Sequence, residues 1–520
     1  MINLILCLPT RNGYQILWVK FSTWEGVWDE TLGPGPLTLA LASLKNTVQS
    51  GGSYVIEVEA DESLAPQSLS YSGVSGVTVT LRNSGGTMRT VSLGSNGALF
   101  TVGSGVTLVL ENNITLSGRS GNDNSVVRVN AGGTFLMEGG TITGNTASAN
   151  VGGVYVTGSG SSFVMSGGVI TGNTSYGGAG VYITGNGAFT MSGTAEITGN
   201  TANNISGGGG VVVNSGSSFN MQGGSIYGNT ASSTDSGLSY GGGGGVKVWD
   251  GVFTMSGGSV SNNTTASPNG GGGVRVVSNG SFTMSGTAAI TGNKATNNSG
   301  KGGGVSVTGS GSSFTMQGGT VSGNTARGYG GGVYVDSGNF SKTGSSSITG
   351  FGSDAVNGNA VKDGSDNAVS NCGHAVYAMR ASVFARRETS IGSGENISFN
   401  GSADPASWEG VWDETLAPGP LTSALVTLKT EAQSGGSYVI EVEANESIAP
   451  QALSYSGRSD ITVILRNSGG TARTVSLGSS GALFTVGSGV TLVLESNITL
   501  SGRSGNDNSV VRVNAGGAFV

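Results

Sequence analysis

The stretch GGVYVTGSGSSFVMSGGVITGNTS, residues 152–175, determines the fold that we predict for this chain. Its segment Val-Tyr-Val at 154–156 sends alternate side chains to opposite faces, which is typical of a short β-strand with one buried side. Phe-Val-Met at 163–165 repeats the alternation, and Ile170 marks a third apolar segment. Glycine-rich turns separate the segments. We therefore predict three short strands per repeat, arranged as a roughly triangular coil.

The pattern recurs with a period of roughly 26–35 residues, within the range of stacked repeat proteins. The first strand recurs around Val154, Val181, Val211, Val246, Val274, Val305 and Val333. The second begins at Phe163, Phe189, Phe219, Phe253, Phe282, Phe314 and Phe340, and an asparagine recurs at Asn145, Asn173, Asn200, Asn229, Asn263, Asn293 and Asn324. Stacked coils lie about 4.8 Å apart, which predicts ladders of Val, Phe and Asn. The expected fold is all-β, a right-handed parallel β-helix with short N-terminal capping helices.

A longer repeat divides the chain, because residues 24–135 match residues 408–519 without gaps at an offset of 384. In the first copy Leu37, Leu41 and Leu44 have helical spacing, and a matching segment follows in the second. We predict that each forms a helix that covers the open end of a β-helix. The expected parts are an unassigned segment 1–23, a first capped β-helix 24–350, a linker 351–407 and a second, truncated β-helix 408–520. A second copy that stops within a strand suggests part of a longer product.

Composition restricts the partners. The chain has 97 glycines among 520 residues and a formal net charge of -7, and no basic patch, so nucleic acid is not an expected partner. Its two cysteines, Cys7 and Cys372, predict neither a disulfide framework nor a metal site. Residues 2–8 are apolar without a preceding Lys or Arg, which makes a poor signal peptide. No stretch is long enough to cross a membrane as a helix.

The alternation of GGGV with FxMxGGxIxGN over residues 99–340, and again over 483–520, resembles the repeats of polymorphic outer-membrane-protein-like and related β-helix surface proteins. Those families carry GGA(I/V/L) and FxxN motifs, whereas here Asn173 follows Phe163 by ten residues. The longer form is similar to large repeat proteins of spirochaetes and other host-associated bacteria. The resemblance implies an adhesin of the cell surface, associated with the outer membrane, or of secreted material.

An enzyme built on a β-helix would need clustered carboxylates, commonly with a basic residue or calcium. Between Glu138 and Phe340 the acidic residues are Glu138, Glu196, Asp235, Asp250 and Asp336. We expect no two at equivalent points of adjacent coils. Asp250 and Asp336 come closest, but three coils separate them by roughly 14 Å, beyond the reach of about 10 Å of a carboxylate pair.

The single histidine, His374, falls in the predicted linker beside Cys372, and its sequence neighbours supply no acid–base partner. The glycine-rich turns lack the aspartate of calcium-binding repeats, and no Lys-Ser/Thr follows them as in a phosphate loop. We therefore predict no catalytic residue, no metal site and no cofactor.

The outward residues of the first strand form one candidate surface. They are Tyr155, Tyr182, Val212, Lys247, Arg275, Ser306 and Tyr334, with Trp249 beside them. Stacking predicts an exposed stripe of aromatic and basic groups, which suits a sugar or a protein partner. The candidate binding residues are Tyr155, Tyr182, Lys247, Trp249, Arg275 and Tyr334. An ordinary exposed strand face would look the same. Outward threonines such as Thr141 and Thr143 also suggest an ice-binding array, but Glu196 and Tyr227 interrupt it.

Three functions are compatible with these observations. The first is a non-enzymatic surface or secreted protein that binds a host-surface protein or glycan. The second is a structural stalk that displays another part of the protein. The third is a carbohydrate-active enzyme whose site lies outside this chain. Because no catalytic cluster is predicted, we expect the first.

Overall fold

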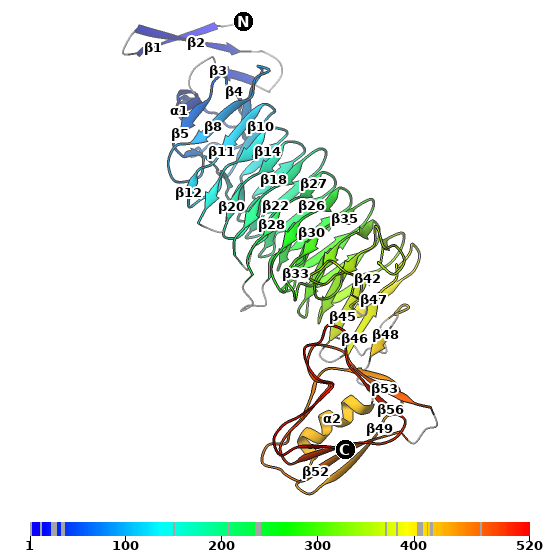
Figure 1. The fold of residues 1–520 in the computed structure, drawn as a ribbon. Coiled ribbons are helices and arrows are strands. Elements are labelled where there is room, and N and C mark those ends of the chain that lie inside the picture. The colour runs from blue at the N-terminus through cyan, green and yellow to red at the C-terminus, as the bar shows by residue number, and fades with distance from the viewer. Residues whose placement is uncertain are drawn as a thin grey trace. The chain divides into compact units, whose positions relative to one another are not determined.

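The computed structural model describes residues 3–10, 13–21, 29–32, 37–148, 151–204, 207–234, 241–369, 372–380, 383–402, 409–412, 414–416, 420–467 and 471–520. The chain divides into two compact units (Figure 1). Unit 1 comprises Met1–Ala378 and Arg386–Asp413, and unit 2 comprises Met379–Ala385 and Glu414–Val520. Each is an all-β parallel β-solenoid with one short helix among its described residues. No helix in the described parts is long and apolar enough to cross a membrane.

A central coil of unit 1 contains four strands, not the three that we predicted. In one coil these are β17 (Val154–Thr157), β18 (Ser162–Met165), β19 (Val169–Thr171) and β20 (Thr174–Ser175). The fourth strand is only two residues long and has a single inward side chain, so the sequence shows no alternation there. Each strand pairs in parallel with its equivalent, as Phe163 does with Phe189.

Stacking produces four sheets, which we number in the order in which a coil passes through them (Figure 1). Sheet 1 runs from β6 (Gln67–Leu69) to β45 (Val376–Arg380), and sheet 2 from β4 (Ser53–Glu57) to β42 (Asn339–Lys342). Sheet 3 runs from β5 (Glu62–Leu64) to β43 (Ser347–Ile348), and sheet 4 from β12 (Ser120–Asn122) to β44 (Ala360–Val361). Sheet 2 extends beyond β4 through β3 (Asp29–Leu32) to the antiparallel hairpin of β1 (Asn3–Thr10) and β2 (Gly13–Phe21).

The inner face of sheet 2 confirms the predicted phenylalanine ladder. Neighbouring rings from Phe135 to Phe340 are stacked with their centroids 4.6 to 5.5 Å apart. Each ring is at most 2% exposed. Burial of apolar surface on this scale is the main stabilising contribution to a coil, and the stacked rings add attraction of their own.

The corner between sheets 3 and 4 confirms the predicted amide ladder. The backbone N–H and the Nδ2 of Asn200 both donate to the Oδ1 of Asn229, each at 3.0 Å, and the same two bonds join Asn229 to Asn263. The members are Asn145, Asn173, Asn200, Asn229, Asn263, Asn293, Asn324 and Asn359, all 0% exposed. Because these buried amides bond to each other and to the backbone, the asparagines have a structural role.

Both predicted capping helices are present. In α1 (Leu37–Thr47) the side chains of Leu37, Leu41 and Leu44 are buried. The backbone N–H of Leu37 donates to Glu62 at 2.6 Å. In α2 (Pro420–Glu431) the N–H of Leu421 donates to Glu446 in the same way, at 3.1 Å. A carboxylate at a helix N-terminus is favourable because it satisfies a backbone donor and meets the positive end of the helix dipole.

In its described residues the segment 351–407 is not a linker, because residues 351–378 and 386–402 belong to the end of the unit 1 solenoid, while residues 379–385 belong to unit 2. Strands β44 and β45 continue sheets 4 and 1, and β47 (Ile397–Asn400) pairs antiparallel with β42. Lys342 replaces a ladder methionine, and its ammonium group donates to the carbonyls of Gly392 at 2.8 Å and Glu395 at 2.6 Å. The glycine rhythm fades here because the chain stops repeating and covers the last coil.

Unit 2 repeats the first coils of unit 1. Its sheets are β49 (Ser437–Glu441), β52 (Ile461–Arg466), β55 (Val490–Leu494) and β58 (Ala518–Phe519); β50 (Glu446–Ile448), β53 (Arg473–Leu477) and β56 (Ile498–Ser501); and β51 (Gln451–Leu453), β54 (Phe484–Val486) and β57 (Val511–Val513). Its core packs α2 against these strands.

Candidate binding surfaces

The predicted outward row exists on sheet 1 with the expected register. Its successive partners are Tyr155, Tyr182, Val212, Lys247, Arg275, Ser306 and Tyr334. Arg128 precedes Tyr155 in the same row. The parallel stacking of identical strand positions therefore places all the predicted members on one face, but their exposure differs along it.

The first part of the row is open to solvent. Tyr155 and Tyr182 are both half-buried, and their rings meet edge to face with centroids 5.8 Å apart. The guanidinium of Arg128 lies 5.0 Å from the centroid of the Tyr155 ring. The Nδ2 of Asn214 donates to the hydroxyl of Tyr182 at 2.9 Å, and burial raises the pKa of that hydroxyl. We call Arg128, Tyr155 and Tyr182 the tyrosine surface.

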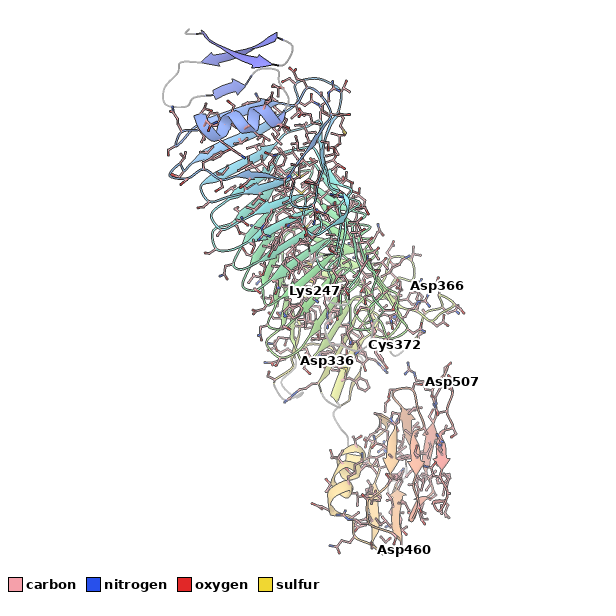
Figure 2. The ribbon with its side chains drawn as sticks, turned by 90° about the vertical axis from the view of Figure 1, so that its left-hand side faces the viewer. Lys247, Asp336, Asp366, Cys372, Asp460 and Asp507 are labelled. Carbon is pink, nitrogen blue, oxygen red and sulfur yellow. The ribbon has the colours of Figure 1, made fainter. Side chains whose placement is uncertain are left out.

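The second part of the row is buried, so the prediction of a continuous exposed stripe was wrong. Lys247, Arg275 and Tyr334 are each 0% exposed; Figure 2 labels Lys247 within the stacked coils. Trp249 is half-buried and lies under the Lys247 ammonium, 4.7 Å from it. Burial and the neighbouring Arg275 lower the pKa of Lys247 well below its usual value, and burial lowers the pKa of Arg275 to about 10.

The glycine run before each strand of sheet 1 packs against the outward row. A side chain at Gly208 would meet Val212 at 2.7 Å and Lys247 at 3.3 Å, so the chain itself packs against the outward face. The connection before the Tyr182 strand is 176–180, whereas the connection before the Lys247 strand is 232–245. At its far end Tyr334 is covered differently, because the Lys301 ammonium lies 5.0 Å from its ring.

One pair of acidic residues at equivalent points of adjacent coils lies partly outside the range of acids considered in the sequence. Glu111 and Glu138 directly follow β10 (Val106–Leu110) and β14 (Thr134–Met137), which pair with each other. They therefore occupy equivalent points of adjacent coils. Sequence reasoning missed this pair because it considered acids only from Glu138 onward, although the register of the two strands could have shown it. Asp235 lies outside the described residues.

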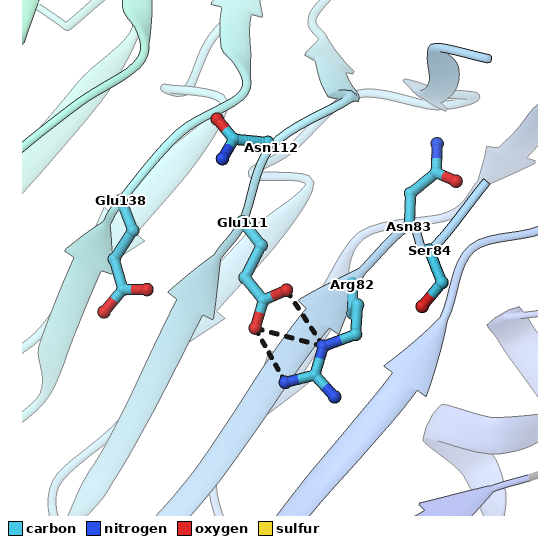
Figure 3. Close-up of a pocket in the computed structure, with 6 residues that line it drawn as sticks. All are labelled: Arg82, Asn83, Ser84, Glu111, Asn112 and Glu138. Carbon is cyan, nitrogen blue, oxygen red and sulfur yellow. Dashed lines mark hydrogen bonds and ion pairs between the residues drawn. The ribbon is translucent and has the colours of Figure 1, made fainter. Parts of the chain in front are cut away.

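A shallow polar groove lies beside Glu111 and Glu138, at the ends of their strands (Figure 3). Its lining is Arg82, Asn83, Ser84, Glu111, Asn112 and Glu138, and it holds about 430 Å³. The Arg82 guanidinium donates two hydrogen bonds to the Glu111 carboxylate, from Nε to Oε2 and from Nη2 to Oε1, both at 2.9 Å. The Ser84 hydroxyl donates to Glu57 at 2.9 Å. Strands of sheet 2 end at this corner, so three consecutive coils contribute three, two and one of these residues.

The remaining chemical candidates lie in the core. His374 is 4% exposed, its Nδ1 accepts the N–H of Val361 at 2.9 Å, and its Nε2 lies 3.5 Å from Glu388. Burial lowers the pKa of His374, while Glu388 raises it to a smaller extent. Cys372 is buried. Among the described residues, no three His, Cys, Asp or Glu side chains are grouped as a metal site.

Comparisons with known proteins give only a slight structural likeness. No protein-family model matches the chain, and no curated protein matches it. Among solved structures, the chain is similar to a PL6 family alginate lyase, AlyGC, at 9% identity and a TM-score of 0.23, over 92% of this chain and 74% of that one. So slight a likeness carries no argument about a site or a substrate.

Proposed function

We propose that the chain is a non-enzymatic bacterial protein of the cell surface or secreted material, whose solenoid is a rigid scaffold for adhesin-like binding. The tyrosine surface carries this proposal. Inside each coil the repeated side chains are occupied by stacking, whereas Arg128, Tyr155 and Tyr182 stay accessible on three successive coils. Repeat proteins commonly bind through such faces.

The chemistry of the tyrosine surface suits a glycan or a protein of a host surface. Tyrosine rings offer an apolar face for sugar rings or side chains together with a hydroxyl for hydrogen bonding. The guanidinium over the Tyr155 ring adds donors and a positive charge. Trp249 is half-buried farther along the same sheet, while Lys247, Arg275 and Tyr334 lie beneath the surface and do not belong to the proposed site.

A second candidate function is supported by the Glu111–Glu138 pair. Adjacent coils are about 4.8 Å apart, so the backbones of Glu111 and Glu138 are close neighbours, and glycoside hydrolysis commonly uses a pair of carboxylates. Arg82 forms an ion pair with Glu111 at 2.9 Å. This arrangement favours a carbohydrate-active enzyme more than the sequence alone did. The buried His374 does not add a third catalytic group to the pair.

The test is binding of the purified full chain to an array of host glycans and to host cells. We expect binding that falls at least tenfold in the Tyr155→Ser/Tyr182→Ser variant. Tyr227→Ser, which removes a half-buried tyrosine from sheet 3, should leave it unchanged. Equal binding by both variants would show that the ligand does not use the tyrosine surface, and no binding by the parent chain would favour a structural stalk. Release of sugar fragments from a polysaccharide, lost in Glu138→Gln, would establish the enzyme instead.

A further inference from the structure

The groove at the corner of sheet 2 is a second surface, separate from the tyrosine surface on sheet 1. It is formed by three consecutive coils, whose strands β7 (Val77–Arg82), β10 and β14 pair in parallel and end side by side. Figure 3 shows Glu111 and Glu138 projecting from neighbouring strands, with Arg82 joined to Glu111. Its volume, about 430 Å³, falls within the range of small-molecule sites.

The floor of the groove is held rigidly. Three hydrogen bonds of 2.9 to 3.2 Å fix Arg82 against Glu111. The Nδ2 of Asn83 donates to the carbonyls of Thr87 at 2.7 Å and Asn113 at 2.9 Å. Charged pairs in a bidentate geometry are among the stronger and more directional hydrogen bonds in proteins. The floor therefore presents a fixed pattern of donors and acceptors to a ligand.

Two side chains of the groove remain available. Glu138 and Asn112 are exposed, and in the described parts of the chain neither side chain makes a hydrogen bond or an ion pair. Glu138 offers acceptors only, whereas the amide of Asn112 offers both donors and acceptors. A ligand in the groove would therefore meet both kinds of group beside the fixed floor.

The charges of the lining restrict the class of ligand. One guanidinium faces two carboxylates, and that guanidinium is already engaged by Glu111. An anionic polymer such as a uronate would be repelled by Glu138, and the lining has no second cation to compensate for this repulsion. A strongly cationic ligand would be repelled by Arg82. The lining has no apolar side chain, which disfavours a lipid. A ligand hydroxyl can hydrogen-bond with every polar side chain of the lining, because a hydroxyl both donates and accepts.

Unit 2 contains the same floor. Arg466 grips Glu495 at 2.8 Å through both Nε and Nη2, and Asn467 donates to the carbonyls of Thr471 and Asn497 at 2.8 and 3.0 Å. Surface positions around this floor differ between the copies, since Met88 corresponds to Ala472 and Asn112 to Ser496 in unit 2. The floor is therefore a reproducible product of this sequence and not an accident of one coil.

We propose that the groove binds a neutral, hydroxyl-rich oligosaccharide, with Glu138 and Asn112 as its hydrogen-bonding groups and the Arg82–Glu111 pair as its floor. The inference does not depend on the proposed role of the tyrosine surface, because the two surfaces lie on different sheets and share no residue. It also differs from catalysis, since it requires only that the ligand bind and be released unchanged.

The experiment titrates the full chain with neutral hexasaccharides of glucose and mannose, and with alginate and chitosan oligomers. We expect binding of at least one neutral oligosaccharide, weakened at least tenfold in Glu138→Ala/Asn112→Ala. Glu196→Ala, a carboxylate on sheet 3 that accepts a hydrogen bond from Tyr227 at 3.0 Å, is the matched control and should bind normally. Tyr155→Ser/Tyr182→Ser should also bind normally, which separates this site from the tyrosine surface.

Three results would overturn the proposal. They are no binding of any neutral oligosaccharide in the panel, equal binding by the Glu138→Ala/Asn112→Ala variant, and preference for chitosan or alginate over the neutral sugars. The substituted side chains are exposed, so the variants are expected to fold. A circular dichroism spectrum like that of the parent chain checks this.

Discussion

The inner ladders and the outer row of sheet 1 are both stacked in register, yet only the ladders keep one residue from coil to coil. Inside, each phenylalanine or asparagine has the same neighbours above and below, so the same side chain fits every coil. Outside, the neighbours include the connection from sheet 4, whose length changes between coils. A position that keeps the same residue in every coil therefore indicates stacking on its own equivalents. A position whose residue varies indicates that the segment packed over it differs between coils.

The largest expected effect is in the phenylalanine ladder. Phe219→Ala removes a ring that is 1% exposed and stacks on two others, at 4.6 and 4.7 Å. A cavity of this kind costs about 4 kcal/mol, measured as a shift in the denaturant midpoint by circular dichroism. The control is Asn220→Ala, on the same strand β26 (Ser218–Met221) but facing outward. A similar loss from both would remove the distinction between the inner and outer faces.

The amide ladder should show the next largest effect. Asn229→Leu keeps the approximate volume but removes the acceptor of the buried backbone N–H of Asn200, whereas the Nδ2 of Asn200 keeps the carbonyls of Ile170 and Thr198. A buried donor without a partner costs about 1–3 kcal/mol, so we expect a loss of up to about 3 kcal/mol in the same unfolding measurement. Asn220→Leu should cost little. A neutral result for Asn229→Leu would mean that stacking does not depend on the ladder.

The sequence predicted the ladders because they repeat. Phe163 and Asn173 recur at fixed positions, and stacking follows directly from parallel pairing. The four-strand coil was missed at β20, since a two-residue strand with one inward side chain leaves no periodic signal. The terminal coil was mistaken for a linker because its sequence does not repeat. Lys342 reaches carbonyls fifty residues later in the chain, and no local pattern predicts such a contact.

The candidate sites were less predictable than the fold. Register alone placed Tyr155 and Tyr334 in one row, but exposure depends on Lys301 and on connections that the repeat does not specify. The groove joins side chains of three coils, of which Glu111 and Glu138 occupy equivalent positions. Aligning β10 with β14 in sequence would have identified that pair.

The end of the amide ladder should respond to pH, unlike its middle. Strand β44 follows Asn359, and its Val361 N–H donates to the Nδ1 of His374, which is possible only when that nitrogen carries no proton. Burial lowers the folded-state pKa of His374 below its ordinary value of about 6.5. Its contribution to stability is therefore complete above the unfolded pKa and is lost as pH falls through the folded pKa.

The measurement compares the unfolding of the parent chain and His374→Gln from pH 8 to pH 4.5. The stability advantage of the parent should shrink toward acid pH. Asn229→Leu, in the middle of the ladder, should lower stability by the same amount throughout this range. An advantage of the histidine that grows as the pH falls would instead show that its pairing with Glu388 dominates.

The smallest effect is expected at the open end of the outer row. Tyr155→Ser removes a half-buried ring whose contacts are Tyr182 and Arg128, and ring contacts of this kind contribute about 0.5–1.5 kcal/mol. We expect a loss of no more than about 1 kcal/mol by denaturant unfolding. Tyr334→Ser is the matched comparison, because the same residue in the same row is 0% exposed and its loss should cost about 3 kcal/mol. Equal losses would mean that Tyr155 is covered as fully as Tyr334 in solution, and the tyrosine surface would then not be available to a partner.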